Sequence, residues 1–354
     1  MLFQAYYDDA VRVGSVLPSG RRRAMVTLRD VARAAGVSPA TASRALGNPD
    51  VVAVSTRERV LRTARELGYR ANQAARALAT GNSGMIGLVL PDIESPFFAS
   101  IAKGVDARAR ELGSAVLIAD TEEDAALEFE IAARVQERVE GVILCSPRMS
   151  RAHLEELAAL GPVVLVNREA GGLPSVSFDT PAGVREALVL LHGLGHRSVG
   201  YVGGPRSAWS DAERRSTLDA VAGLEVDGLD IVDLGHHRPV FSSGVAAADA
   251  AAASGATAVL CYNDLVALGV IRRLQSRGIR VPEDISVVGF DDIPFATLAA
   301  PPLTTVAVPW APAGRAAVDL LLGTGRPQAP QHFRLAVDLV VRDSTGAGPA
   351  GNAE

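Results

Sequence analysis

Long apolar runs are missing from this chain of 354 residues, although hydrophobic residues make up 48% of it. No uninterrupted apolar run approaches the ~18 residues that a membrane-spanning helix needs. The first 20 residues lack the cationic start and apolar core of a secretory signal, and they contain the adjacent Asp8 and Asp9. These absences argue against a membrane protein and against export. We therefore expect a cytoplasmic protein without a membrane partner.

Cysteine is scarce as well. The chain has two cysteines, Cys145 and Cys261, and each stands inside an apolar run. We expect small core residues in a reducing compartment and no disulfide framework. The length predicts two or three domains with full hydrophobic cores.

Motifs of catalysis and metal binding are also missing. The sequence contains no G-x-S-x-G elbow, no H-E-x-x-H pair and no C-x-x-C pair. The run GLGHRS at 193–198 lacks the third glycine of a dinucleotide fingerprint and lies between a helix and the following strand, which is the wrong order for phosphate binding. His236 and His237 have no further ligands at metal spacing and read as a polar loop. We expect no enzyme, no catalytic residue, no metal and no cofactor.

The distribution of charge is more informative than its total. The whole chain has a formal charge of −5, but residues 21–80 contain twelve Arg and four Asp or Glu, which leaves −13 for the rest. A basic module of this size attached to an acidic body indicates a nucleic-acid partner. A solvated arginine-rich face is the alternative that charge alone leaves open.

The basic segment predicts three short helices. Thr27 and Asp30 form a capping-box pattern before a helix that ends at Gly36, and Ser38 with Pro39 starts a second helix that runs to about Leu46. The short interval between these helices is typical of a helix-turn-helix. The second helix should turn one set of residues outward, Pro39, Ala40, Ser43 and Arg44, and another inward, Ala42, Ala45 and Leu46.

A third helix and a joint follow. Ser55 and Glu58 predict a second capping box, which opens a helix with Val60, Leu61, Ala64 and Leu67 on its buried side. Asn72 can cap a helix of about eight residues, 72–79, but this alanine-rich helix is too short to be stable alone in water. Residues 81–84 are rich in glycine and small polar residues, as in a flexible joint.

From Met85 the pattern changes to apolar runs that alternate with amphipathic stretches. This rhythm predicts parallel sheets covered on both faces, and its length of about 225 residues predicts two α/β lobes. Ligands of such lobes bind beyond the carboxyl ends of the strands. The polar residues at those ends are Asp92, Asp120, Asn167, Asp179, Asn263 and Asp291.

Several motifs together resemble the lactose-repressor (LacI/GalR) family of bacterial transcription regulators. The likeness covers residues 25 to about 342 and begins with VTLRDVARAAGVSPATASRALGN. Its later marks are SPFF at 95–98, GHR at 195–197, TAVLCYND at 257–264, VPEDISVVGFDD at 281–292 and PPLTTV at 301–306. The resemblance implies a homodimeric or tetrameric repressor whose periplasmic-binding-protein-like core holds an effector between two lobes.

For DNA, the resemblance implies phosphate contacts from Ser38, Thr41 and Ser43 and base-reading positions at Pro39, Ala40 and Arg44. Arg44 is the long donor among the three, so we expect it to read a guanine, and a phosphate-bound or solvated Arg44 is the alternative. Leu78 matches a wedge into the minor groove, and a packed interdomain leucine is its alternative. The full expected DNA-binding set is Thr27, Ser38, Pro39, Ala40, Thr41, Ser43, Arg44, Asn72 and Leu78.

For the effector, the resemblance implies a pocket that contains Arg214, Asn263 and Asp291, with Asn167 in place of a common acidic residue and Phe98 on the inner wall. An arginine, a carboxylate and an amide that converge on a cleft can hold neighbouring hydroxyls of a sugar or sugar derivative. Trp209 and Phe241 are expected stacking faces, with lobe packing as their alternative. Thr217 and Ser95 stand where the family usually has Gly and Asn.

These observations predict an all-α helix-turn-helix headpiece joined by a hinge helix to an α/β core of two parallel-sheet lobes. The expected boundaries are a disordered or mis-annotated extension at 1–24, the headpiece at 25–71, the hinge at 72–84, an N-terminal lobe of 85–178 with 308–336, a C-terminal lobe of 179–307 with 337–343, and a disordered tail at 344–354. The expected function is effector-controlled repression at a pseudo-palindromic double-stranded operator. After an enzyme, a periplasmic sugar-binding protein is the second rival, and the lack of a signal peptide and the basic helix-turn-helix argue against it.

Overall fold

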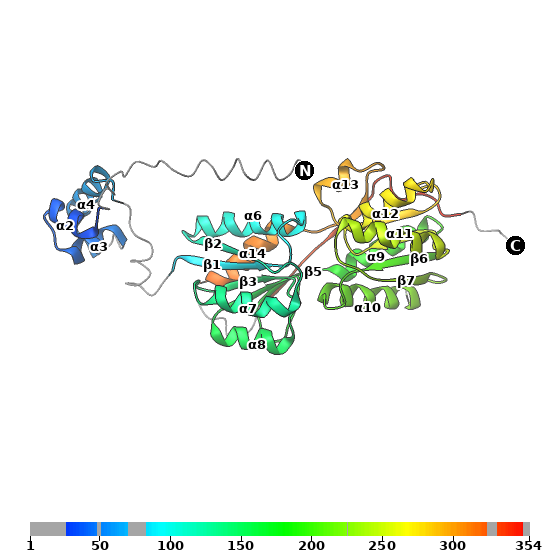
Figure 1. Cartoon of the computed structure of the whole chain (residues 1–354), viewed down its shortest axis with the longest axis horizontal. Coiled ribbons are helices and arrows are strands. Elements are labelled where there is room, and N and C mark those ends of the chain that lie inside the picture. Colours follow the sequence, from blue (N-terminus) through cyan, green and yellow to red (C-terminus); the bar gives the residue numbers. More distant parts are fainter. Residues whose placement is uncertain (1–25, 48–50, 70–82, 225, 324–330, 350–354) are drawn as a thin grey trace, which may run out of the picture. The chain divides into compact units, whose positions relative to one another are not determined.

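The computed structural model describes residues 26–47, 51–69, 83–224, 226–323 and 331–349. The chain divides into two compact units, Met1–Asn82 and Ser83–Glu354 (Figure 1). The expected extension at 1–24, the residues 72–82 of the expected hinge, and with them Asn72 and Leu78, lie outside the described residues.

The first unit contains three helices around a small apolar core. The helices are α2 (Leu28–Ala35), α3 (Pro39–Gly47) and α4 (Val54–Glu66). The capping box predicted for α2 is confirmed, because the Thr27 side chain accepts from the Asp30 N–H and the Asp30 carboxylate accepts from the Thr27 N–H at 2.9 Å. Gly36 ends this helix with a φ of 65°, a left-handed conformation that favours glycine.

The second capping box is a correction. Helix α4 begins at Val54 after Ala53, and no side chain caps it, so Ser55 lies inside the helix rather than at its start. Val60 and Ala64 are buried as expected, but Leu67 follows the end of the helix and is 39% exposed. Ser55 lies two residues after the N-cap position Ala53, so a local S-x-x-E pattern does not by itself decide where this helix begins.

The second unit contains two six-stranded sheets, one in each lobe. The sheet of the N-terminal lobe has the order β11-β5-β4-β3-β1-β2, and all of its pairs are parallel. Its strands are β1 (Met85–Leu90), β2 (Ala115–Asp120), β3 (Val142–Cys145), β4 (Val163–Val166), β5 (Ser175–Phe178) and β11 (His332–Leu335).

The sheet of the C-terminal lobe has the order β12-β10-β9-β8-β6-β7, and it is parallel except for the antiparallel edge strand β12. Its strands are β6 (Ser198–Gly203), β7 (Asp230–His236), β8 (Ala258–Cys261), β9 (Ser286–Asp291), β10 (Thr304–Ala307) and β12 (Asp338–Val340). The predicted pair of α/β lobes with parallel sheets is confirmed.

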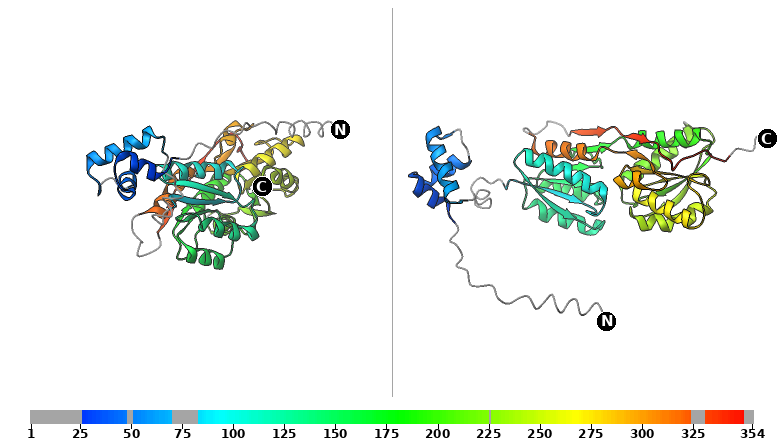
Figure 2. Two further views of the ribbon diagram at one scale, coloured as in Figure 1. Left: turned by 60° about the vertical axis from the view of Figure 1, so that its left-hand side comes forward. Right: turned by 90° about the horizontal axis from the view of Figure 1, so that it is seen from above.

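Helices cover both faces of each sheet (Figures 1 and 2). In the N-terminal lobe, α6 and α14 share one apolar core with the sheet, and α7 and α8 share another on the opposite face. In the C-terminal lobe, α9 and α10 cover one face and α11, α12 and α13 the other. The helices are α6 (Pro96–Glu111), α7 (Ala125–Gln136), α8 (Arg151–Leu160), α9 (Thr180–Gly193), α10 (Trp209–Leu224), α11 (Phe241–Ala253), α12 (Asp264–Ser276), α13 (Pro294–Leu298) and α14 (Trp310–Leu322).

The chain passes between the lobes three times. The crossings lie between β5 and α9, between β10 and α14, and between β11 and β12. Both sheets direct the carboxyl ends of their parallel strands at the space between the lobes, which is where a ligand site is expected in this architecture (Figure 2).

The expected disordered tail is corrected for residues 344–349. Ser344 is fully buried, accepts from the Thr304 N–H at 2.8 Å and donates to the Val287 carbonyl at 2.6 Å. The Gly348 N–H donates to the Leu194 carbonyl at 2.7 Å. Backbone and hydroxyl hydrogen bonds, rather than an apolar face, fix this segment in place. Because such bonds leave no apolar pattern in the sequence, the sequence predicted a disordered tail here.

The two cysteines are buried, as predicted. Cys145 ends β3 and Cys261 ends β8, and their side chains are at most 1% exposed. Burial raises the pKa of both thiols, which keeps them protonated.

Candidate functional site

Helix α3 presents a polar surface in the first unit. Ala42 and Ala45 are buried against α2 and α4, whereas Pro39, Ala40, Ser43 and Arg44 are exposed. This is the division of faces that the sequence predicted. An exposed second helix is the element that a helix-turn-helix inserts into the major groove.

Hydrogen bonds organise the start of α3. The Ser38 Oγ accepts from the Thr41 N–H at 3.1 Å and lies 2.9 Å from the Thr41 Oγ1, so Ser38 caps the helix as predicted. The Arg44 Nε donates to the Ala40 carbonyl at 3.3 Å, which folds the side chain along its own helix. This long contact leaves most of the guanidinium donors of the exposed Arg44 available.

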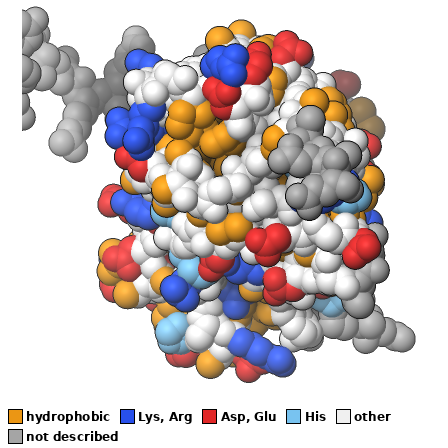
Figure 3. Space-filling model, turned by 90° about the vertical axis from the view of Figure 1, so that its right-hand side faces the viewer, with side chains coloured by type: hydrophobic (Ala, Val, Ile, Leu, Met, Phe, Trp, Pro, Cys, Tyr) orange, Lys and Arg blue, Asp and Glu red, His pale blue; other side chains and the backbone are white. Residues whose placement is uncertain are grey.

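Exposed arginines lie on all three helices of the first unit. They are Arg29, Arg33, Arg44, Arg59, Arg62 and Arg65. On the face of the second unit in Figure 3, acidic and basic side chains are mixed rather than gathered by sign. The basic character predicted for residues 21–80 is thus visible on the described part of the first unit.

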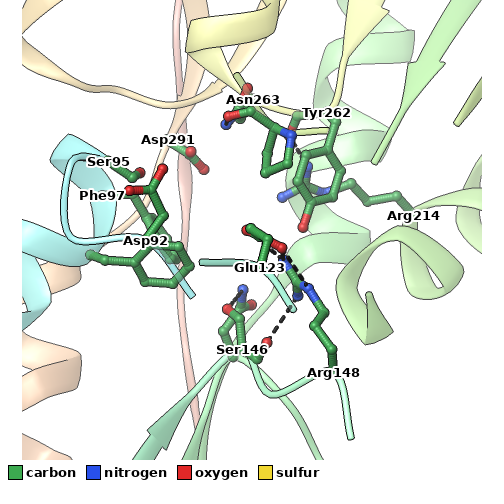
Figure 4. Close-up of a pocket in the computed structure, with 13 residues that line it drawn as sticks. Asp92, Ser95, Phe97, Glu123, Ser146, Arg148, Arg214, Tyr262, Asn263 and Asp291 are labelled. Carbon is green, nitrogen blue, oxygen red and sulfur yellow. Dashed lines mark hydrogen bonds and ion pairs between the residues drawn. The ribbon is translucent and has the colours of Figure 1, made fainter. Parts of the chain in front are cut away.

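A pocket lies between the lobes of the second unit (Figure 4). Its lining residues surround about 410 Å³ of space, part of which is open solvent. Loops at the carboxyl ends of β1, β2, β3 and β4 supply one wall, and α10 with the ends of β7, β8 and β9 supplies the other. The lining residues are Asp92, Ser95, Phe97, Phe98, Glu123, Ser146, Arg148, Asn167, Arg214, Pro239, Tyr262, Asn263 and Asp291.

Five of the seven expected effector residues line this pocket: Phe98, Asn167, Arg214, Asn263 and Asp291. Trp209 and Phe241 are not among the residues that line it. Each is the first residue of a helix, α10 and α11, and Phe241 is 45% exposed to solvent.

Several lining residues were not predicted. Glu123, Ser146 and Arg148 lie in the loops after β2 and β3, and Tyr262 precedes the predicted Asn263. The end of β3, which contains Cys145, gave no polar strand-end signal. The rule that ligands bind beyond parallel strands would have found Ser146 had it been applied to the residue that follows the cysteine.

A buried ion pair forms the lower wall of the pocket in Figure 4. The Arg148 Nε and Nη2 donate to the two Glu123 carboxylate oxygens at 3.2 and 3.3 Å, and the side chains are 4% and 8% exposed. The Arg148 Nη1 donates to the Ser146 carbonyl at 2.9 Å. Although burial lowers the pKa of Arg148, the nearby Tyr262 and Glu123 raise it above its ordinary value.

Arg214 reaches the pocket from α10. Its Nη1 donates to the Tyr262 carbonyl, and its guanidinium carbon lies 3.5 Å from the Phe290 ring centroid and 4.7 Å from the Tyr262 centroid. The residue is 5% exposed, and its buried Nε has no hydrogen-bond partner among the described residues. Aromatic faces hold the guanidinium flat while its remaining donors stay available to a ligand.

Asp291 faces Arg214 from the end of β9. Burial raises the pKa of Asp291 well above its ordinary value, the carboxyl of Asp264 raises it further, and Arg214 opposes the shift. Behind it, burial raises the pKa of Asp264 to about 7, while hydrogen bonds from Thr305 and the Ile293 N–H lower it. Two carboxyls that share a buried site favour a protonated state, in which a carboxyl can donate as well as accept.

Unusual backbone conformations cluster at this pocket. Among the described residues, six that are not glycine have a positive φ: Glu122, Glu123, Ser146, Asn167, Asp291 and Asp292. Four of them line the pocket and the other two are their neighbours. Strain of this kind costs about 1–3 kcal/mol for each residue and tends to concentrate at functional sites.

The described residues contain no cluster of three or more His, Cys, Asp or Glu placed to hold a metal ion. Within the described residues, each helix is also too short or too polar to cross a membrane.

The fold and the pocket define a class of protein. Its members combine, in one chain, a helix-turn-helix unit and a two-lobed core like that of periplasmic binding proteins. Residues 27–72 match the family described as bacterial regulatory proteins, lacI family, and residues 189–345 match the periplasmic binding protein-like domain. The chain belongs to the lacI family of bacterial transcription regulators.

Individual relatives agree with this assignment. The transcriptional regulator DegA of Bacillus subtilis is 35% identical over 333 residues, which cover 90% of this chain and 98% of DegA. A lac repressor dimer bound to operator and the anti-inducer ONPF is similar with a TM-score of 0.79 and 28% identity, and covers 91% of this chain and 99% of that one. The regulator CelR in complex with cellobiose has a TM-score of 0.65 and 31% identity, over 90% and 99% of the two chains.

Proposed function

We propose that the protein is a transcriptional repressor whose operator affinity is controlled by a carbohydrate bound between the two lobes. The observation that carries this proposal is a pocket lined from both lobes in the same chain as an exposed recognition helix. A ligand that touches both lobes binds one lobe arrangement better than another. It therefore shifts the population of lobe arrangements by its differential affinity.

The chemistry of the pocket supports a carbohydrate. Carboxylate and amide groups of Asp291, Asn263 and Asn167 offer acceptors and donors, Arg214 offers fixed donors, and Phe98 offers an apolar wall. Sugars present alternating hydroxyls above an apolar ring face, which such a set can satisfy. A bound sugar in the related CelR structure is in line with this choice.

At the operator, we propose that Arg44 reads a base edge and that Thr27, Ser38, Thr41 and Ser43 contact phosphates. Arg44 is exposed at the middle of α3, and the hydroxyl residues surround the start of α2 and α3. Phosphate contacts fix the register of a recognition helix, and base contacts supply its sequence preference.

The decisive experiment measures operator affinity with and without a sugar found by thermal-shift screening. A ligand that binds the folded state alone raises the melting temperature by mass action. Arg214→Ala and Asp291→Ala should abolish the effect of the sugar on operator affinity while leaving operator binding near normal. Glu111→Ala, an exposed carboxylate of the core outside the pocket, is the control. Full retention of the sugar response in both pocket variants would show that the effector binds elsewhere.

A further inference from the structure

The Glu123–Arg148 ion pair is not explained by stability. Taking both charges out of water costs several kcal/mol, and mutual attraction often does no more than offset that cost. Glu123 also has a φ of 59° and its neighbour Glu122 a φ of 53°, so the loop that supplies the carboxylate is strained. Such costs at a pocket wall indicate a role in the site.

The loop that supplies Arg148 does not depend on the ion pair for its conformation. The buried Glu128 carboxylate accepts from the Arg148 N–H at 2.8 Å and from the Met149 N–H at 2.6 Å. The Arg148 Nη1 bond to the Ser146 carbonyl adds a third anchor within this loop. Glu123 can therefore be changed without removing what holds the backbone of the Arg148 loop.

Glu123 decides the charge that a ligand meets at this wall. The pocket is lined by three carboxyl side chains, Asp92, Glu123 and Asp291, and two guanidinium groups, Arg148 and Arg214. Without Glu123, the bidentate edge of Arg148 would be a strong site for a carboxylate or phosphate. With Glu123 in place, that edge is filled from within the protein, and an anionic ligand would meet a second anion there.

We propose that Glu123 excludes anionic effectors by occupying Arg148, so that the pocket selects neutral sugars over sugar acids and sugar phosphates. The inference rests on the proposed carbohydrate effector and adds its charge class. A built-in repulsive group is an effective way to reject a competitor that shares most contacts with the preferred ligand. The neutral hydroxyls of a sugar can accept from the free N–H groups of Arg148 and donate to the Glu123 oxygens without breaking the pair.

The test is calorimetric titration of the full chain with matched neutral and acidic sugars. The probes are glucose with glucuronate and glucose 6-phosphate, galactose with galacturonate, and cellobiose with cellobiuronate, so that each acidic sugar keeps the ring of its neutral counterpart. We expect the wild type to bind at least one neutral sugar at least ~10-fold more tightly than its acidic counterpart, a difference of ~1.4 kcal/mol.

Two variants separate the role of Glu123 from general damage. Glu123→Gln leaves Arg148 without its carboxylate, so the preference for the neutral sugar should fall at least ~10-fold as the acidic sugar gains affinity. The double variant Glu123→Gln with Arg148→Met carries no unpaired charge, and it should gain no affinity for the acidic sugar. Glu111→Gln removes a carboxylate that pairs with Arg108 and Arg315 outside the pocket, and it should keep the wild-type preference.

Some results of these titrations would overturn the role of Glu123 alone, and others would overturn the carbohydrate proposal as well. Equal wild-type binding of a neutral sugar and its acid would overturn the role of Glu123 and leave the carbohydrate pocket standing. An unchanged preference in Glu123→Gln, or the same gain for acids in the double variant, would also overturn it. Failure of every neutral and acidic sugar to bind would overturn the carbohydrate proposal and this inference with it.

Discussion

At the scale of single residues, the pocket depends on buried groups whose protonation and pairing are set by their surroundings. Asp264 is the clearest case, because its carboxyl is fully buried behind Asp291 and accepts from the Thr305 hydroxyl at 2.6 Å and the Ile293 N–H at 2.8 Å. These bonds join the start of α12 to β10 and to the loop between β9 and α13. Asp264 itself does not line the pocket.

Asp264 should make stability depend on pH. Burial raises its folded pKa to about 7 from the ordinary 3.8, so between these values the unfolded chain releases a proton that the folded chain keeps. The free energy of unfolding therefore falls as the pH rises through this window, by up to ~1.4 kcal/mol per pH unit from this group, and the loss is complete above the folded pKa. Urea unfolding of the wild type and of Asp264→Asn should show a shallower decline of the unfolding free energy with pH in the variant, whose amide oxygen can still accept from the Ile293 N–H. If the free energy of unfolding declined equally with pH in both proteins, this role of Asp264 would be contradicted.

Binding assays should distinguish the base contact proposed for Arg44 from the phosphate contact proposed for Ser38. Arg44→Ala should lose about 1–3 kcal/mol of discrimination at one base pair in each half-site, because a bidentate contact to guanine disappears. Ser38→Ala should weaken binding to all sequences about equally, because it removes a proposed phosphate contact and the cap of α3. Binding to a set of single-base operator variants measures both. Equal losses across all base variants for Arg44→Ala would assign Arg44 to a phosphate.

At the scale of elements, each lobe contains one helix pair packed through glycine. In the C-terminal lobe, Gly269 of α12 and Gly244 of α11 face each other, and a Cβ at Gly269 would overlap the Phe241 carbonyl oxygen. In the N-terminal lobe, Gly314 of α14 lies against the backbone of Ile101 in α6. Neither pair tolerates a larger residue without separating the two helices.

Gly269→Ala should lower the free energy of unfolding by about 1–3 kcal/mol, because the added methyl forces α11 and α12 apart. Gly223→Ala is the matched control, since Gly223 also lies in a helix, α10, but its Cβ would meet nothing within 4 Å. That control should be neutral or stabilising by up to ~1 kcal/mol. Denaturant unfolding of both variants compares them, and equal effects would mean that the helix contact is not tight.

The helices, the two lobes and part of the pocket could be predicted from the sequence. Capping residues and apolar periodicity placed α2, α3 and the alternating lobes, because these signals are local. Strand-end polarity placed Asn167, Asn263 and Asp291 at the pocket. Glu123 and Arg148 escaped because their pairing joins two loops 25 residues apart, and such a contact leaves no periodic trace in the sequence.

At the scale of the whole molecule, one headpiece offers a small surface for DNA. Its described helices span residues 28–66, and a single module of this size buries too little DNA surface for a tight site. We therefore expect two chains on one pseudo-palindromic operator. Native mass spectrometry of the complex should show two chains per duplex, and a duplex with one half-site should bind at least ~10-fold more weakly. A single chain that binds one half-site with full affinity would refute this.

The three crossings between the lobes also determine when each lobe can finish folding during synthesis. The N-terminal lobe needs α14 and β11, which a ribosome adds after the strands β6 to β10 of the other lobe. Until residue 322 emerges, the apolar face of α6 has no complete α14 to cover it, and until residue 335 emerges, β5 is an unpaired edge. At ~5–20 residues per second, the nascent N-terminal lobe stays incomplete for roughly 8–30 seconds after β5 is synthesised. A premature stop before residue 332 thus removes both β11 and β12 and leaves both lobes unfinished, not one.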